Sequence, residues 1–136
     1  MRRQAELLSP GSADRSGTLL RLGAPISFWG GVDYESGHIT QGGHPQRGRQ
    51  VAGTVLAIPA TIGSSCSSAV LAELIRNGQA PAALLLQEVD AILIVGVLVA
   101  REMGWPAPTV ARIALDDLPL KGEVSITANG AISWED

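Results

Sequence analysis

The chain has 136 residues, which is enough for one domain with a buried core, and its net charge is −3. No basic stripe accompanies this acidic balance, and this argues against binding to nucleic acid. Only 17% of the residues are charged, below the usual quarter, so we expect a partner protein to cover part of the surface.

Cysteine content and hydropathy limit the cellular setting. The one cysteine cannot form an internal disulfide, which fits a reducing compartment, and it cannot hold a metal cluster alone. The N-terminus lacks the apolar core of a signal peptide. Residues 91–100 are wholly apolar, but a membrane-spanning helix takes about 20 residues. We therefore expect a cytoplasmic protein without a membrane anchor.

The first elements in chain order are a tail and a strand. Residues 1–16 are polar, contain Pro10 and Gly11 and follow no period, so we expect a flexible, frayed tail. One domain then spans residues 17–136. Its first strand is predicted at 18–23.

A long glycine-rich segment follows at residues 24–50. It holds six glycines and two prolines, which predicts a loop with short strands at 26–28 and 37–39. Loops of this length are uncommon in compact domains unless they have a function.

The middle of the chain alternates strands and helices. Strands are predicted at 51–59, 81–87 and 108–113. The first of the two helices between them ends at Gly78 and has one apolar face, formed by Val70, Leu71, Leu74 and Ile75. The second helix, at 91–103, is capped by Asp90. Its β-branched residues leave a strand as the alternative, but its length favours a helix.

The C-terminal segment "GEVSITANGAISWED" predicts a β-hairpin. We prefer a three-residue loop, Ala128–Gly130, because it places Ile126 opposite Ile132 on a shared apolar face. Gly130 then takes the left-handed position. The order of elements indicates a mixed α/β domain with one core and some parallel strand pairing.

A serine-rich turn joins the strand at 51–59 to the helix after it. Gly63 precedes four serines in five positions, Ser64, Ser65, Ser67 and Ser68. A helix N-terminus carries unpaired N–H groups and partial positive charge, so this turn can bind a carboxylate of a small substrate. The alternative is helix capping and turn formation alone. The Gly-Lys-Ser/Thr ending of a nucleotide phosphate loop is absent.

Several of these segments together resemble the swivel domain of the aconitase X family, over residues 18–136. They are "PISFWGGVDYESGHI" at 25–39, "HP" at 44–45, "GSS" at 63–65 and "VLAELIRNGQAPAAL" at 70–84. The resemblance implies an aconitase-type swivelling β/β/α domain, with a mixed sheet or barrel-like core and flanking helices.

The resemblance also implies an activity, that of a hydro-lyase (dehydratase) assembled from two parts. A large catalytic subunit carries an iron–sulfur or iron centre, and the swivel domain supplies a serine as base. Carried over to this chain, Ser64 is the base and Ser65, with Gly63 and Ser67, contacts the substrate. We therefore expect activity only with a large subunit, and no cofactor or metal held by this chain alone.

Two substrates are known in the family that the chain resembles. Bacterial members dehydrate cis-3-hydroxy-L-proline to Δ1-pyrroline-2-carboxylate, and archaeal members act on a phosphorylated mevalonate. Few basic residues lie near the serine turn to hold a phosphate, which favours hydroxyproline. A phosphomevalonate dehydratase small subunit, or a non-catalytic module that binds a carboxylate or a protein, are the alternatives.

Five further residues have more than one interpretation. Trp29 either faces the large subunit or the substrate channel, or packs on its own domain. For Asp33 we favour an Asx-turn over a functional carboxylate. His38 and His44 are expected to be solvated or hydrogen-bonded rather than metal ligands. Cys66, beside the helix start, is expected to be a small packing residue rather than a reactive thiol.

Overall fold

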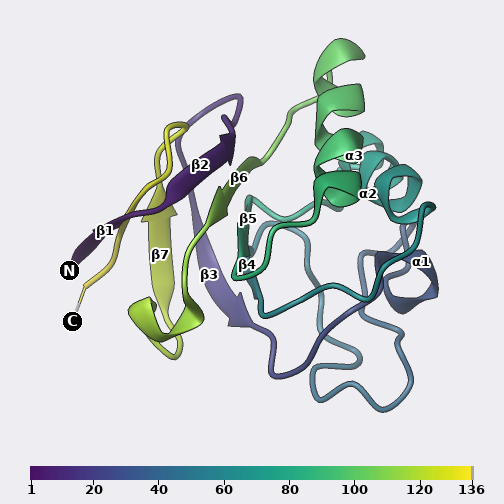
Figure 1. The fold of residues 1–136 in the computed structure, drawn as a ribbon, viewed down its shortest axis with the longest axis horizontal. Helices are drawn as coiled ribbons and strands as arrows, with labels where there is room; N and C mark the ends of the chain where they lie inside the picture. The colour runs from purple at the N-terminus through teal and green to yellow at the C-terminus, as the bar shows by residue number, and fades with distance from the viewer. Residues whose placement is uncertain (136) are drawn as a thin grey trace.

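The computed structural model describes residues 1–135 of the chain. Within them the strands are β1 (Arg2–Gln4), β2 (Glu6–Ser9), β3 (Arg15–Arg21), β4 (Val55–Ile58), β5 (Ala83–Leu86), β6 (Thr109–Arg112), β7 (Glu123–Ile126) and β8 (Ala131–Ser133). The helices are α1 (Phe28–Gly31), α2 (Ser67–Arg76), α3 (Ala91–Glu102) and a 3-10 turn at Leu115–Asp117. Figure 1 shows the strands on one side of the molecule and the helices on the other.

The strands form one mixed sheet in the order β1-β8-β7-β3-β4-β5-β6-β2. β3, β4, β5 and β6 are parallel, as the buried strands flanked by helices predicted. β1 and β2 lie at opposite ends of this order, yet only Ala5 separates them along the chain. The sheet therefore closes on itself, and the expected fold class, a mixed α/β domain with a barrel-like core, is confirmed.

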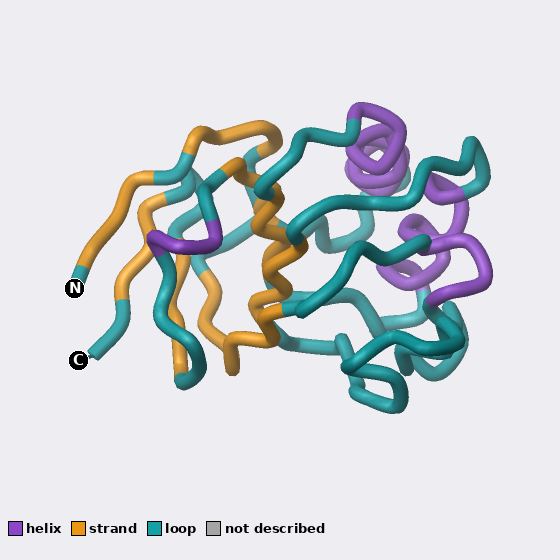
Figure 2. Tube along the Cα trace, turned by 60° about the horizontal axis from the view of Figure 1, so that its bottom comes forward, coloured by secondary structure: helices purple, strands orange, loops and turns teal. Residues whose placement is uncertain are grey.

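Strands β4 and β5 are buried on both faces because the barrel is filled inside and covered outside. In β4, Val55 and Ala57 belong to the cluster inside the barrel, and Leu56 and Ile58 belong to the cluster beneath the helices. Successive strand residues point to opposite faces, so such a strand reads as a continuous apolar run. Helices α2 and α3 pack against each other and cover the outer face (Figure 2).

The two predicted helices are present. Helix α2 is followed by Gly78 in the left-handed conformation, with φ of 71°, and its apolar face is buried. Asp90 caps α3, where its carboxylate accepts hydrogen bonds from the N–H groups of Ile92 and Leu93. The helix prediction for this apolar segment is confirmed over the strand alternative. No helix among residues 1–135 has the length and apolar character needed to cross a membrane.

The C-terminal hairpin has the predicted register. Ile126 pairs with Ile132 in β7 and β8, and the N–H of Thr127 donates to the carbonyl of Ala131 at 2.9 Å. This leaves a three-residue loop in which Gly130 has φ of 88°. Both apolar side chains of the pair are buried inside the barrel.

The N-terminal segment expected to be a frayed tail instead belongs to the sheet. Strand β1 pairs with β8, and β2 pairs with β6. The N–H of Ala5 donates to the carbonyl of Gly130 at 3.0 Å. The prediction was wrong because these strands are held by backbone hydrogen bonds while most of their side chains are exposed, so they carry no apolar pattern.

The long segment 24–50 has little regular structure but a buried underside. Its expected short strands are reduced to isolated bridges, Ile26 with Thr61, Val32 with Ile39 and His38 with Gln50. Four of its apolar side chains enter the outer core, those of Ile26, Phe28, Val32 and Ile39, together with that of the adjoining Val51. The segment is thereby held beside helix α2.

Candidate functional site

The serine-rich turn lies between β4 and helix α2, on the helical side of the barrel. Gly63 and Ser65 are exposed and Ser64 is partly exposed. Ser67 is the first residue of α2 and only 3% exposed. The substrate-binding roles expected of Ser65, Gly63 and Ser67 stay predictions, and of these three Ser67 faces solvent least.

The Ser64 hydroxyl sits in a local hydrogen-bonded turn. Its Oγ accepts a hydrogen bond from the N–H of Cys66 at 3.2 Å, and its carbonyl accepts one from the N–H of Ser67 at 3.1 Å. A backbone N–H aimed at a hydroxyl oxygen stabilises the deprotonated form of that hydroxyl. The geometry around Ser64 therefore suits a serine that removes a proton.

The start of α2 is left uncapped. Cys66 is the N-cap residue, and its side chain makes no capping hydrogen bond. Among residues 1–135 the N–H groups of Ser68 and Ala69 have no hydrogen-bond partner. Ser68 Oγ turns back to the carbonyl of Ser65, at 3.5 Å. Because unpaired N–H groups at a helix start attract anions, the arrangement can receive a carboxylate.

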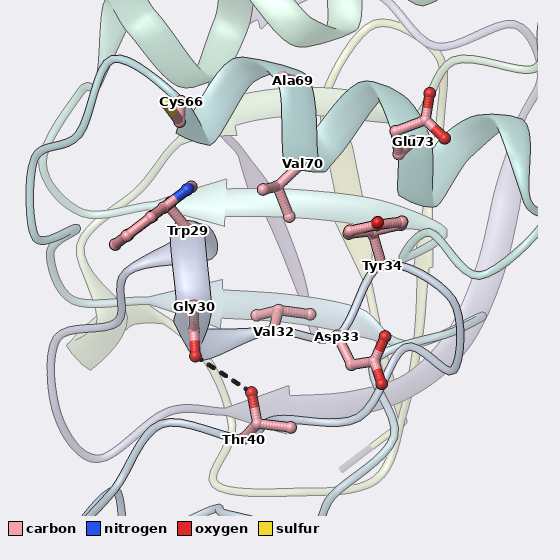
Figure 3. A pocket seen from close by; sticks show the side chains of 10 residues that line it. All are labelled: Trp29, Gly30, Val32, Asp33, Tyr34, Thr40, Cys66, Ala69, Val70 and Glu73. Carbon is pink, nitrogen blue, oxygen red and sulfur yellow. Dashed lines mark hydrogen bonds between the residues drawn. The ribbon is translucent and has the colours of Figure 1, made fainter.

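A groove of about 650 Å³ opens beside the serine-rich turn. We call it the Trp29 groove. It is lined by Trp29, Gly30, Val32, Asp33, Tyr34, Thr40, Cys66, Ala69, Val70 and Glu73. Figure 3 shows that these residues come from helix α2 on one side and from the segment around α1 on the other. Cys66 and Ala69 connect the groove to the helix start, whereas Ser64, Ser65 and Ser67 do not line it.

Hydrogen bonds within the loop fix the wall that carries Trp29. Thr40 Oγ1 donates to the carbonyl of Gly30 at 3.2 Å, and Gln41 Oε1 accepts from the N–H of Ser27 at 2.8 Å. Gly30 has φ of 78°, which favours glycine. Trp29 itself is 60% exposed, so the interpretation that it packs on its own domain is wrong. Sequence reasoning missed Thr40 and Gln41, because nothing in a polar loop marks the residues that brace it.

The two carboxylates of the groove have different partners. Asp33 Oδ1 accepts a hydrogen bond from the N–H of Glu35 at 2.9 Å, which confirms the Asx-turn. This bond from Glu35 is the main reason why the pKa of Asp33 is lowered from its ordinary value. Glu73 pairs with Arg76 one helical turn away, at 3.2 Å.

The histidines of the loop are separate from the groove. His44 is 6% exposed; its Nδ1 accepts from the N–H of Gln46 at 3.0 Å, so its Nε2 carries the proton and donates to the carbonyl of Ala24 at 3.1 Å. The prediction of a hydrogen-bonded histidine is confirmed for His44, and His38 is exposed. Cys66 is also exposed, so its expected role as a packing residue is wrong. Residues 1–135 contain no group of three side chains able to hold a metal ion.

Comparison with known proteins gives concordant matches. A family model described as the aconitase X swivel domain matches residues 3–134. A Pseudomonas aeruginosa protein named cis-3-hydroxy-L-proline dehydratase is 50% identical over 71% of this chain, which spans only 16% of that protein's length. A Thermococcus gammatolerans phosphomevalonate dehydratase small subunit is 39% identical over 83% of this chain and 82% of its own. The crystal structure of Thermococcus kodakaraensis aconitase X superposes with a TM-score of 0.87 at 25% identity, covering 100% of this chain and 99% of that one.

Proposed function

Because the chain belongs to the aconitase X swivel domain family, we propose that it is the small subunit of a hydro-lyase and completes its active site with a larger catalytic subunit. Two similarities support the proposal. The archaeal relative of similar length is named a small subunit, and the bacterial dehydratase contains far more chain than the part matched here. The observation that carries it is the uncapped start of α2 beside the Ser64 hydroxyl.

In this proposal Ser64 is the base. The free N–H groups of Ser68 and Ala69 hold the substrate carboxylate, which makes the proton on the adjacent carbon more acidic. Ser64 first loses its own proton to give an alkoxide, which the N–H of Cys66 stabilises, and its Oγ then takes up the substrate proton. The electrons of the broken C–H bond form the double bond, and the neighbouring hydroxyl takes up a proton from an acid on the large subunit and leaves as water.

The described residues do not form a binding site for the iron–sulfur or iron centre that the family implies. The chain has one cysteine, and residues 1–135 bring no three potential metal ligands together. We assign the centre to the large subunit. Ser64, Ser65, Gly63 and Ser67 remain the residues that this chain is proposed to contribute.

For the substrate we propose cis-3-hydroxy-L-proline, which becomes Δ1-pyrroline-2-carboxylate. The similarity to the bacterial dehydratase of that substrate supports this choice. The charges of the groove beside the serine-rich turn support it as well. Asp33 and Glu73 are the charged residues that line the adjoining groove, with no lysine or arginine among the lining residues. A phosphorylated substrate would bring two or more negative charges towards them.

The test is a reconstituted assay with the large subunit encoded in the same genome. The wild-type complex is expected to form the cyclic imine from cis-3-hydroxy-L-proline and to leave phosphomevalonate unchanged. Ser64→Ala should bind the large subunit normally and lose at least about 10²-fold in kcat, because the base is gone. Ser68→Ala, which removes a hydroxyl bonded only to a backbone carbonyl, is the control. Full turnover by an assembled Ser64→Ala complex would overturn the assignment of the base.

A further inference from the structure

We propose that the Trp29 groove docks a segment of the large subunit that carries an arginine or lysine, with its cation beside Tyr34, Asp33 and Glu73. The inference rests on the proposed function for the existence of that subunit, and it identifies the surface and the chemistry by which the two chains meet.

The walls of the groove expose large apolar surfaces. The side chain of Trp29 is 60% exposed and that of Tyr34 is 43% exposed, and Val32 and Val70 form the floor between them. Tryptophan and tyrosine are the side chains most enriched at the energetic centres of protein interfaces. An exposed tryptophan fixed by a hydrogen-bonded loop is preorganised to receive a partner, since little freedom is lost on binding.

The groove is too long for the small substrate. Cys66 and Glu73 line it from the same helix seven residues apart, which is about 10 Å along the axis. Figure 3 shows Trp29 near Cys66, with Tyr34 and Asp33 towards the Glu73 end. A single imino acid bound at the helix start would leave the Glu73 end empty. A volume of about 650 Å³ instead fits several side chains of an extended or helical segment.

The two carboxylates at the Glu73 end of the groove favour a positively charged side chain of the partner. Asp33 and Glu73 both line the groove, and no lysine or arginine does. Asp33 stays ionised to lower pH than an ordinary aspartate because its pKa is lowered by the hydrogen bond from Glu35. The Glu73–Arg76 pair is exposed and therefore weak, so a partner's cation can compete for Glu73. A guanidinium there can bind a carboxylate and stack on the Tyr34 ring.

Docking at this groove would also close the active site. The groove shares Cys66 and Ala69 with the start of α2, and Cys66 supplies the N–H that bonds Ser64 Oγ. A segment seated against Trp29 would exclude water from the free N–H groups of Ser68 and Ala69. This would strengthen their interaction with a carboxylate.

The experiment measures the affinity of this chain for the purified large subunit at low and high salt. Trp29→Ala removes the exposed aromatic wall and should weaken binding by about 10-fold or more. The double variant Asp33→Asn, Glu73→Gln removes both charges while asparagine keeps the Asx-turn. It should weaken binding about 10-fold at low salt and lose most of the salt dependence of the wild type. Circular dichroism spectra should be unchanged for both.

Two matched controls lie outside the groove. Glu35→Gln removes an exposed carboxylate from the same loop, and Leu120→Ala removes an exposed apolar side chain far from the serine-rich turn. Both are expected to bind as the wild type does. Ser64→Ala should also bind normally, which separates docking from chemistry. If the wild-type chain bound no large subunit, the proposed function itself would fail.

Two results would overturn the docking proposal while leaving the proposed function intact. In the first, the wild type binds and turns over substrate, and the Trp29 and double variants bind equally well with the same salt dependence. In the second, cis-3-hydroxy-L-proline added to the isolated chain produces a saturable shift of the Trp29 indole N–H signal in NMR spectra. The groove would then be a substrate site.

Discussion

The starts of helices α2 and α3 lie on the same side of the barrel, but a side chain caps α3 and none caps α2. At α3 the Asp90 carboxylate accepts from the N–H groups of Ile92 and Leu93 at 2.9 and 3.2 Å, and from the Thr61 hydroxyl at 2.6 Å. At α2 the residue in the same position, Cys66, bonds nothing with its side chain. The sequence around α2 nevertheless contains more potential capping groups.

This difference shows that hydroxyl content does not determine whether a helix is capped. One well-placed carboxylate satisfies α3, whereas the serines before α2 bond to the turn itself. Leaving a helix start uncapped costs on the order of 1 kcal/mol of stability. That cost is consistent with a helix start kept free for a ligand, and the following variants test this view of the two helices.

The largest effect is expected where the two helices touch. A Cβ added at Gly96 of α3 would clash with the backbone carbonyl oxygen of Ser68. Gly96→Ala should therefore destabilise the fold by about 1–3 kcal/mol, although alanine in place of glycine usually stabilises a helix. It should also lower turnover by displacing the start of α2. Urea denaturation measures the first effect, with Val95→Ala on the exposed face of α3 as the control, and a gain in stability would contradict the prediction.

Removing the cap of α3 should have the next largest effect. Asp90→Ala is expected to cost about 1–2 kcal/mol, because two N–H groups and the Thr61 hydroxyl lose their acceptor. Asp90→Asn retains an accepting oxygen and should cost much less. The free energies of unfolding from urea titrations decide between them. Equal losses in the two variants would show that charge, not capping, matters at this position.

Adding a carboxylate to the start of α2 should make it resemble α3. Cys66→Asp is expected to raise stability by about 0.3–1 kcal/mol, because the negative charge lies at the positive end of the helix. Turnover in the assembled enzyme should fall, since the new carboxylate repels that of the substrate. Cys66→Asn, which has nearly the same shape without the charge, is the control. An unchanged KM in Cys66→Asp would argue against carboxylate binding at this end of the helix.

The smallest effect concerns the Asx-turn in the wall of the groove. Here, as at the start of α3, an aspartate carboxylate accepts a hydrogen bond from a backbone N–H two residues further along the chain. The pKa of Asp33 is lowered, chiefly by the N–H of Glu35, so its midpoint should fall below the ordinary aspartate value near 3.8. The stability this carboxylate contributes is present above its unfolded-state pKa and is lost as the pH falls through its folded-state pKa. NMR titration of the side-chain carboxyl carbon measures the midpoint. An upward shift would contradict the assigned hydrogen bond.

Most of the barrel was predictable because its central strands are buried on both sides. The apolar runs that form β4, β5 and β6 are recognisable as buried strands in the sequence. The hairpin register follows from pairing Ile126 with Ile132 on one apolar face. Strands β1 and β2 were not predictable. Their pairing depends on backbone hydrogen bonds to β8 and β6, and no pattern of apolar residues in the sequence indicates these bonds.

The candidate site was predictable in part, for a related reason. The serine-rich turn and the Trp-Gly-Gly motif are visible as unusual composition, and the structure brings Cys66 beside Trp29. The groove between them was not visible, because it depends on how segment 24–50 folds over α2. Its carboxylate Glu73 looks in the sequence like any exposed residue of an amphipathic helix. The sequence also did not show that α3 is capped and α2 is not. The difference depends on the backbone conformation at the residue before each helix, Asp90 and Cys66.

The closure of the barrel brings the two ends of the chain together. The N-terminal amine donates to the carbonyl of Trp134 at 2.9 Å, and the N–H of Trp134 donates to the carbonyl of Met1 at 3.1 Å. Figure 1 places both ends on the side of the molecule opposite α2 and α3. Another polypeptide can therefore be joined covalently at either end without crossing the face that carries the serines.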